Sequence, residues 1–162
     1  MNIRIYNARI LTMEENRPIF TGELHVKGNK IAYVGPTLAT CSKKDVEGGD
    51  KDDEKSKECG SASVDVWDRE IDAQMNLIMP GFKNAHTHSG MTFLRSYADD
   101  MPLDDWLSKQ VFPRGAKLTP DDIYHLSKLA ILEYLTSGIT ANLDMYLTPD
   151  AIAKASRDCG FR

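Results

Sequence analysis

One stretch decides the fold, Pro80-Gly81-Phe82-Lys83-Asn84-Ala85-His86-Thr87-His88. Its first two residues end the preceding segment, and the residues that follow are typical of a β-strand. Because side chains at positions i and i+2 of a strand point to the same face, the imidazoles of His86 and His88 are expected to project into one space. Neutral imidazole binds zinc well, so the pair is a candidate metal site. The alternative is two solvated histidines on a half-exposed strand.

The residues that follow predict alternating helices and strands. Residues 91–117 are expected to be irregular because prolines interrupt them. Thr119-Pro120-Asp121-Asp122 combines an N-cap, a proline at the first helical position and first-turn acids, so it predicts a helix that ends near Gly138. The run from Ile139 to Tyr146 predicts a second strand, and Thr148-Pro149-Asp150 predicts a second helix.

This order of elements makes a parallel pair of strands joined by a helix. Two parallel strands have two open edges and little core of their own, and parallel sheets are normally covered on both faces. A barrel of eight such units, about 250 residues long, completes the pattern. Residues 80–162 supply two units, so we expect an α/β protein with a TIM-like (β/α)8 barrel that is truncated or completed by another chain.

Residues 1–79 predict a separate segment rich in β-structure. Glu23–Val26 and Ile31–Val34 read as strands, and the residues between them include Gly28-Asn29. A tight hairpin needs positive φ, which both of these residues tolerate.

A charged segment at about 41–62 cannot bury enough apolar area to offset its ordering entropy, so we expect a mobile surface insertion there. Strand character resumes at Val64–Trp67, near Ile71 and at Leu77–Met79.

The composition is that of a soluble globular protein, with 41% hydrophobic and 27% charged residues. A net charge of -4 gives no electrostatic reason to expect a nucleic acid or an anionic membrane as partner. No apolar run approaches the roughly 20 residues that span a bilayer, and the N-terminus lacks the apolar region of a signal peptide. The three cysteines form no CxxC pair, which predicts a cytoplasmic protein without a thiolate zinc site.

Three segments resemble the amidohydrolase superfamily: Met79 to His88, Met91-Thr92-Phe93-Leu94-Arg95, and Leu103-Asp104-Asp105-Trp106-Leu107. They are most similar to the branch that contains 5-methylthioadenosine/S-adenosylhomocysteine deaminases and related chlorohydrolases. The N-terminal strands resemble the small β-sandwich that precedes the barrel in that family. The resemblance therefore implies a β-sandwich segment at 1–79 and the start of a metal-dependent hydrolase barrel at 80–162.

The resemblance also implies an activity, the hydrolytic deamination of a purine nucleoside-like or other heteroaromatic amine. In the family the two histidines of the first strand, here His86 and His88, bind one divalent metal, usually zinc, with iron also possible. The metal activates a water, and a later histidine, aspartate and glutamate complete the site. No counterpart of these later residues is found in the chain. We therefore expect no catalytic residue within it, and we expect the isolated chain to bind metal weakly and to be inactive.

Three further residues bear on the substrate. Trp106 matches the family tryptophan that lines the substrate pocket, and a core position under the same loop is the alternative. Gly115 stands where the family commonly has a glutamate that holds the ribose hydroxyls of nucleosides, which argues against an adenosine-type substrate. The neighbouring Arg114 suggests an anionic substrate instead. For Asp144 the resemblance implies a structural hydrogen-bonding role.

Two other interpretations stay open. A related hydrolase of the same fold would remove another leaving group, such as halide. The chain would otherwise be a non-catalytic, truncated product that needs a partner to bury its open parallel edges. In either enzyme interpretation the partner is a small-molecule substrate, and a homo-oligomer or a missing C-terminal part supplies the remaining ligands.

Overall fold

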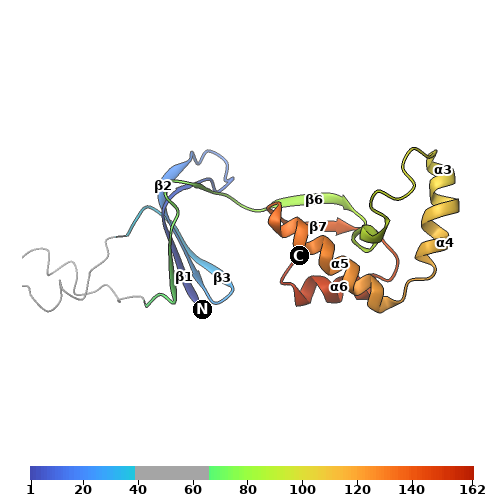
Figure 1. Cartoon of the computed structure of the whole chain (residues 1–162). Helices are drawn as coiled ribbons and strands as arrows, with labels where there is room; N and C mark the ends of the chain where they lie inside the picture. Colours follow the sequence, from blue (N-terminus) through green and yellow to red (C-terminus); the bar gives the residue numbers. More distant parts are fainter. Residues whose placement is uncertain (39–65) are drawn as a thin grey trace, which may run out of the picture. The chain divides into compact units, whose positions relative to one another are not determined.

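The computed structural model describes residues 1–38 and 66–162, which form two compact units (Figure 1). Unit 1 is Met1–Pro80 and unit 2 is Gly81–Arg162. None of the described helices is long and apolar enough to cross a membrane. The charged insertion predicted at about 41–62 lies outside the described residues.

Unit 1 is a five-stranded sheet in the order β3-β2-β1-β4, with β5 also paired to β1. The first three strands are antiparallel neighbours, and β4 and β5 run parallel to β1. The described residues of this unit form one sheet, and the β-sandwich stays a prediction. The strands are β1 (Asn2–Ile10), β2 (Phe20–Lys27), β3 (Lys30–Gly35), β4 (Arg69–Asp72) and β5 (Leu77–Ile78).

The predicted hairpin joins β2 to β3 through a two-residue connection, with Lys27 opposite Lys30. Of the two connecting residues only Gly28 has a positive φ, 66°. The strand predicted at Val64–Trp67 is wrong for its two described residues, because β4 begins at Arg69. The Trp67 ring instead packs on the ring of His25, with 4.5 Å between the centroids.

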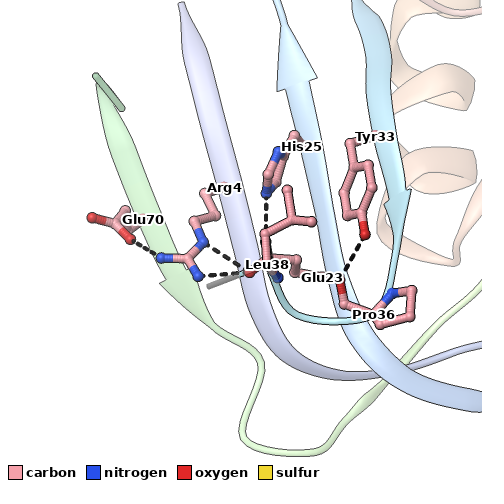
Figure 2. Close-up of polar contacts among 7 residues, drawn as sticks. All are labelled: Arg4, Glu23, His25, Tyr33, Pro36, Leu38 and Glu70. Carbon is pink, nitrogen blue, oxygen red and sulfur yellow. Dashed lines mark hydrogen bonds and ion pairs between the residues drawn. The ribbon is translucent and has the colours of Figure 1, made fainter. Parts of the chain in front are cut away.

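A buried ionic cluster ties β2 to its neighbours (Figure 2). The Glu23 side chain is fully buried, and its Oε2 atom lies 2.6 Å from Nη2 of Arg4. Its Oε1 atom accepts from the backbone N–H of Leu38 at 3.2 Å and lies 3.0 Å from Nε2 of His25. Arg4 also pairs with Glu70 of β4 at 3.1 Å. The cluster therefore joins β1, β2 and β4 to the segment after β3.

The cluster makes the stability of unit 1 depend on pH. Burial by itself raises the pKa of the Glu23 carboxyl, but hydrogen bonds from Arg4, Leu38 and His25 outweigh it and hold the pKa below its ordinary value. A carboxyl whose pKa is lower in the folded state stabilises that state above its unfolded-state pKa, and this stabilisation disappears as the pH falls through the folded-state pKa.

We therefore expect the free energy of unfolding of unit 1 to fall as the pH is lowered from about 5 toward 3. Denaturant midpoints measured across this range test the prediction. A Glu23→Gln variant cannot titrate at this position, so its midpoint is expected to change less with pH. Equal slopes for the two proteins would show that Glu23 is not the group responsible.

Unit 2 is built on β6 (Phe82–Thr87) and β7 (Ile139–Asp144), which pair in parallel as the sequence predicts. Their register places Lys83 opposite Ala141. Figure 1 shows α5 and α6 together on one side of this pair. The helical segments are η1 (Ser89–Leu94), α3 (Leu103–Trp106), the π-helical η2 (Leu107–Val111), α4 (Phe112–Gly115), α5 (Pro120–Thr136) and α6 (Pro149–Asp158).

The predicted start and end of α5 are confirmed. The Thr119 hydroxyl accepts from the Asp122 backbone N–H, and the Asp122 carboxylate accepts from the Thr119 N–H, which together make a capping box. The helix ends before Gly138, whose φ of 79° is a conformation that glycine adopts without steric cost. On its inner face, Ile131 packs with Ala155 of α6 and with Phe161.

The irregular stretch predicted at residues 91–117 is wrong for most of its length, although residues 95–102 belong to no helix or strand. Four helical segments lie within or overlap it, and three of them, α3, η2 and α4, follow one another without a gap from Leu103 to Gly115. The apolar residues Leu103, Trp106, Leu107 and Val111 recur at helical spacing along this run. Pro102 stands directly before the run and Pro113 lies in its last segment, so the two prolines were misinterpreted as breaks in regular structure.

Candidate functional site

The two histidines predicted as metal ligands lie at the carboxyl end of β6. His86 belongs to the strand, and His88 follows it as the residue that precedes η1. Their Nε2 atoms are 3.1 Å apart, and the rings meet edge to face with 84° between their planes. The structure thus brings the two imidazoles into one space, although only the first of them is in the strand.

The backbone of unit 2 sets the orientation of the His88 ring. Its Nδ1 atom lies 2.5 Å from the carbonyl oxygen of Met145. A carbonyl oxygen can only accept, so Nδ1 carries the proton and Nε2 of the neutral ring presents a lone pair. This second contact of a ligating imidazole is typical of metal sites.

The pair fits a divalent metal. Two nitrogens bound to one tetrahedral zinc at about 2.0–2.1 Å are about 3.3 Å apart, close to the separation of the two Nε2 atoms. Within residues 1–38 and 66–162, no group of three or more histidine, cysteine or acidic side chains is arranged to hold a metal ion. The described residues therefore offer two ligands, one fewer than a catalytic zinc normally has.

A cluster of polar side chains, here called the Asp144 cluster (Asp144, Thr87, Ser89 and Asn142), includes the two residues that flank His88. The Asp144 carboxylate accepts from the Ser89 backbone N–H at 3.2 Å, from the Ser89 hydroxyl, and from the hydroxyl of Thr87 at 3.2 Å. It also accepts from the Asn142 amide at 3.1 Å. Since Thr87 and Ser89 flank His88 in the chain, this carboxylate ties both neighbours of His88 to the end of β7.

A pocket of about 430 Å³ opens beside His88, and Trp106 is one of the residues that line it. The walls of the pocket come from η1, from α3, η2 and α4, and from the residues after β7. Apart from His88, Trp106 and Tyr146, these walls are apolar side chains and the backbone of Gly115. Among residues 1–38 and 66–162, no lysine, arginine, aspartate or glutamate lines the pocket.

Gly115 and Tyr146 meet at one wall of this pocket. A Cβ atom built on the buried Gly115 would lie 3.2 Å from the Tyr146 hydroxyl oxygen. That hydroxyl is buried and has no hydrogen-bond partner among the described residues. Burial raises the pKa of the Tyr146 phenol, so the group stays protonated at neutral pH and can donate.

Arg114 does not line the pocket. Its guanidinium donates to the hydroxyl of Tyr97 and to the carbonyl oxygen of Gln110 at 3.2 Å, and it lies 4.4 Å from the centroid of the Tyr97 ring. The anionic substrate suggested by this arginine therefore has no support from the structure.

The sequence alone did not single out the Met145 carbonyl or the Tyr146 hydroxyl. Both follow β7, and the carboxyl ends of adjacent parallel strands meet at the same edge of a sheet. That rule would have placed them beside His88. It would not have identified the contact of the Met145 carbonyl oxygen with His88, because every residue has a backbone carbonyl and the sequence does not show which one is used.

Comparison with known proteins connects this site to one family. The sequence model of the Amidohydrolase family matches residues 77–162, which contain both histidines and the pocket. The chain is 36% identical to a 5-methylthioadenosine/S-adenosylhomocysteine deaminase of Thermoanaerobacter pseudethanolicus over 163 aligned residues. That alignment covers 100% of this chain and 32% of the relative. The chain thus spans about a third of the length of the curated relatives it matches.

Solved structures show the same fold. An adenosine deaminase from Xanthomonas campestris with bound zinc matches 99% of this chain and 32% of its own, with a TM-score of 0.73 and 28% identity. An atrazine chlorohydrolase from Arthrobacter aurescens, complexed with zinc, matches 99% of this chain and 34% of its own with a TM-score of 0.70. At 22% identity the second likeness concerns the fold alone. The family match over residues 77–162, which contain the histidine pair and the pocket, shows that this chain belongs to the amidohydrolase family.

Proposed function

We propose that this chain forms part of a metal-dependent hydrolase that removes the amino group from a purine nucleoside-like or other heteroaromatic amine. The observation that carries the proposal is the pair of Nε2 atoms of His86 and His88, 3.1 Å apart at the edge of a pocket lined by Trp106. Relatives named as deaminases of 5-methylthioadenosine and S-adenosylhomocysteine support this reaction over others of the family.

The metal in this proposal is zinc, supported by the zinc found in the Xanthomonas campestris structure. When bound, such an ion supplies hydroxide at neutral pH by lowering the pKa of a water. His86 and His88 hold it, and the Met145 carbonyl keeps the second ring in the ligating tautomer. Trp106 contacts the substrate. The third protein ligand and the groups that move protons come from residues outside 1–38 and 66–162.

The same proposal covers the architecture. Residues 80–162 begin a TIM-like barrel, residues 1–79 form the β-sandwich segment that precedes it, and further chain or a second copy completes the barrel and the site. The odd number of cysteines supports a cytoplasmic location.

The proposal is tested on the protein purified from its source at its natural length. Ammonia release from 5-methylthioadenosine, S-adenosylhomocysteine and adenosine is measured with the zinc content of the same sample. Release that a chelator abolishes and zinc restores supports the proposal. Halide release from a chlorinated triazine without ammonia release from any amine would favour the chlorohydrolase alternative.

Replacing His88 with alanine is expected to abolish one-to-one binding of Co²⁺ to the chain, because a single imidazole remains. The d–d absorption of Co²⁺ measures this binding, and His86→Ala is expected to give the same loss. His125 lies on the exposed side of α5 with its Nδ1 atom bonded to the Asp121 carbonyl oxygen, so His125→Ala is the matched control and should bind Co²⁺ as the parent does. Equal binding by all three variants would contradict the proposed site.

A further inference from the structure

The helical run from Leu103 to Gly115 contains one π-helical turn, η2, between α3 and α4 (Figure 1). The N–H of Phe112 donates to the carbonyl oxygen of Leu107, five residues earlier, where an α-helix would use the fourth. A turn closed in this way holds one residue more than an α-helical turn, and such turns are frequent at functional sites. Residues on both sides of η2 and within it line the pocket: Trp106, Leu107, Val111, Phe112 and Gly115.

The extra residue decides which way the side chains after it point. Successive α-helical residues are rotated by about 100°, so in an unbroken helix Val111 would stand about 140° and Phe112 about 240° around the axis from Trp106. One inserted residue reduces these angles to about 40° and about 140°. The pocket-lining residues of the run then share an arc of about 140°, which without the insertion would be about 240°. The π-helical turn therefore gathers them on one face.

The side chain of Arg114 bonds the backbone of this turn. Pro113 has no N–H, so it cannot donate to the Lys109 carbonyl four residues earlier as other helical residues do. Nη1 of Arg114 donates to this carbonyl oxygen at 3.4 Å and to that of Gln110 at 3.2 Å. The guanidinium thus supplies donors to two carbonyls of η2 at the point where the proline removes one.

The same guanidinium is fixed from the other side by the loop that precedes the run. Its Nη2 atom donates to the Tyr97 hydroxyl, and its central carbon lies 4.4 Å from the centroid of the Tyr97 ring. A planar guanidinium can stack on a ring and donate several hydrogen bonds at once. Arg114 is therefore held between residues 95–102 and η2.

We propose that Arg114 is a positioning residue for the pocket, because it holds the π-helical turn that directs Trp106 and Val111 into the same space. Its own side chain does not line the pocket, so it acts through the turn. This role deepens the proposed function and rests on it for the use of the pocket.

Arg114→Met removes the guanidinium and keeps a long side chain. The nuclear Overhauser effect between the Trp106 ring and the Val111 methyl groups is measured in the full chain. We expect the effect in the parent, where the π-helical turn brings the two side chains to one side, and its loss in Arg114→Met. Lys109→Met is the matched control, because Lys109 lies in the same turn and its exposed ammonium pairs with Asp105, so the effect should persist. An absent effect in the parent, or an undiminished one in Arg114→Met, would overturn the proposal.

Deleting Ser108 separates the setting of the register from general stabilisation of the run. Ser108 is exposed and does not line the pocket. Without it an unbroken α-helix places Trp106 and Val111 at the angle that the π-helical turn gives them. The deletion is therefore expected to keep the effect, and Arg114→Met added to it should keep the effect too.

Loss of the effect on adding Arg114→Met to the deletion would show that Arg114 stabilises the run without setting its register, and would refute the role given to it. Loss in the deletion alone would refute the geometry of the turn. These measurements need neither metal nor turnover, so the role of Arg114 can fail while ammonia release persists, and ammonia release can fail while that role is upheld.

Discussion

Unit 1 of an Arg4→Ala variant is expected to lose about 3–5 kcal/mol of its free energy of unfolding. The Glu23 side chain is 1% exposed and that of Arg4 is 13% exposed, so the pair is shielded from solvent. Removing the guanidinium leaves a buried carboxylate whose remaining partners are Leu38 and His25. An uncompensated buried charge is much more costly than the loss of an exposed ion pair.

The measurement is denaturant unfolding followed by the emission of Trp67, in a Trp106→Phe background that leaves one tryptophan. The matched control is Arg17→Ala, which breaks the exposed pair between Arg17 and Glu14 and should cost at most about 1 kcal/mol. If Arg4→Ala costs no more than this control, the buried cluster does not stabilise the sheet in the way its geometry indicates.

Asp144→Ala is expected to lower the free energy of unfolding of unit 2 by about 3 kcal/mol, because hydrogen bonds to a charged acceptor contribute about 1.5–3 kcal/mol each and do not add fully. The change leaves the Ser89 N–H without the acceptor it has in the Asp144 cluster. It also removes the carboxylate's bonds to both neighbours of His88, although Thr87 keeps its bond to the Leu143 carbonyl oxygen. We therefore expect Co²⁺ binding to weaken along with stability.

Unfolding of unit 2 is followed by Trp106 emission in a Trp67→Phe background. Asp99→Ala removes an exposed carboxylate in the same unit and is expected to change stability by no more than about 0.5 kcal/mol. Asp144→Asn keeps one oxygen acceptor for Ser89 and should fall between the two. A loss in Asp144→Ala no larger than that of the control would show that the cluster is dispensable.

The parts of the fold that depend on neighbouring residues were predictable from the sequence. The Thr119 capping box, the Gly138 helix end and the hairpin at Gly28 each follow from local backbone chemistry. The parallel pairing of β6 with β7 followed from the order of the elements. The helical run from Leu103 to Gly115 was missed, because Pro102 and Pro113 were interpreted as breaks in regular structure.

The candidate site also has features that the sequence predicts and features that only the folded structure shows. The proximity of the His86 and His88 rings follows from the alternation of side chains along an extended backbone. The Met145 carbonyl that orients one of them comes from a strand far along the chain, and only the folded structure shows it. Likewise, Gly115 stood out as a departure from a resemblance, but its meeting with Tyr146 could not be read from either residue.

The pairing of β6 with β7 has a consequence for the protein while it is being made. The contact between Thr87 and Leu143 joins residues 56 positions apart. A ribosome adds about 5–20 residues per second, so the first strand waits for about 3–11 s before its partner is synthesised. During this interval the histidine pair has no Met145 carbonyl to orient it, so a metal ion that arrived early would meet the proposed site before its second ring is oriented.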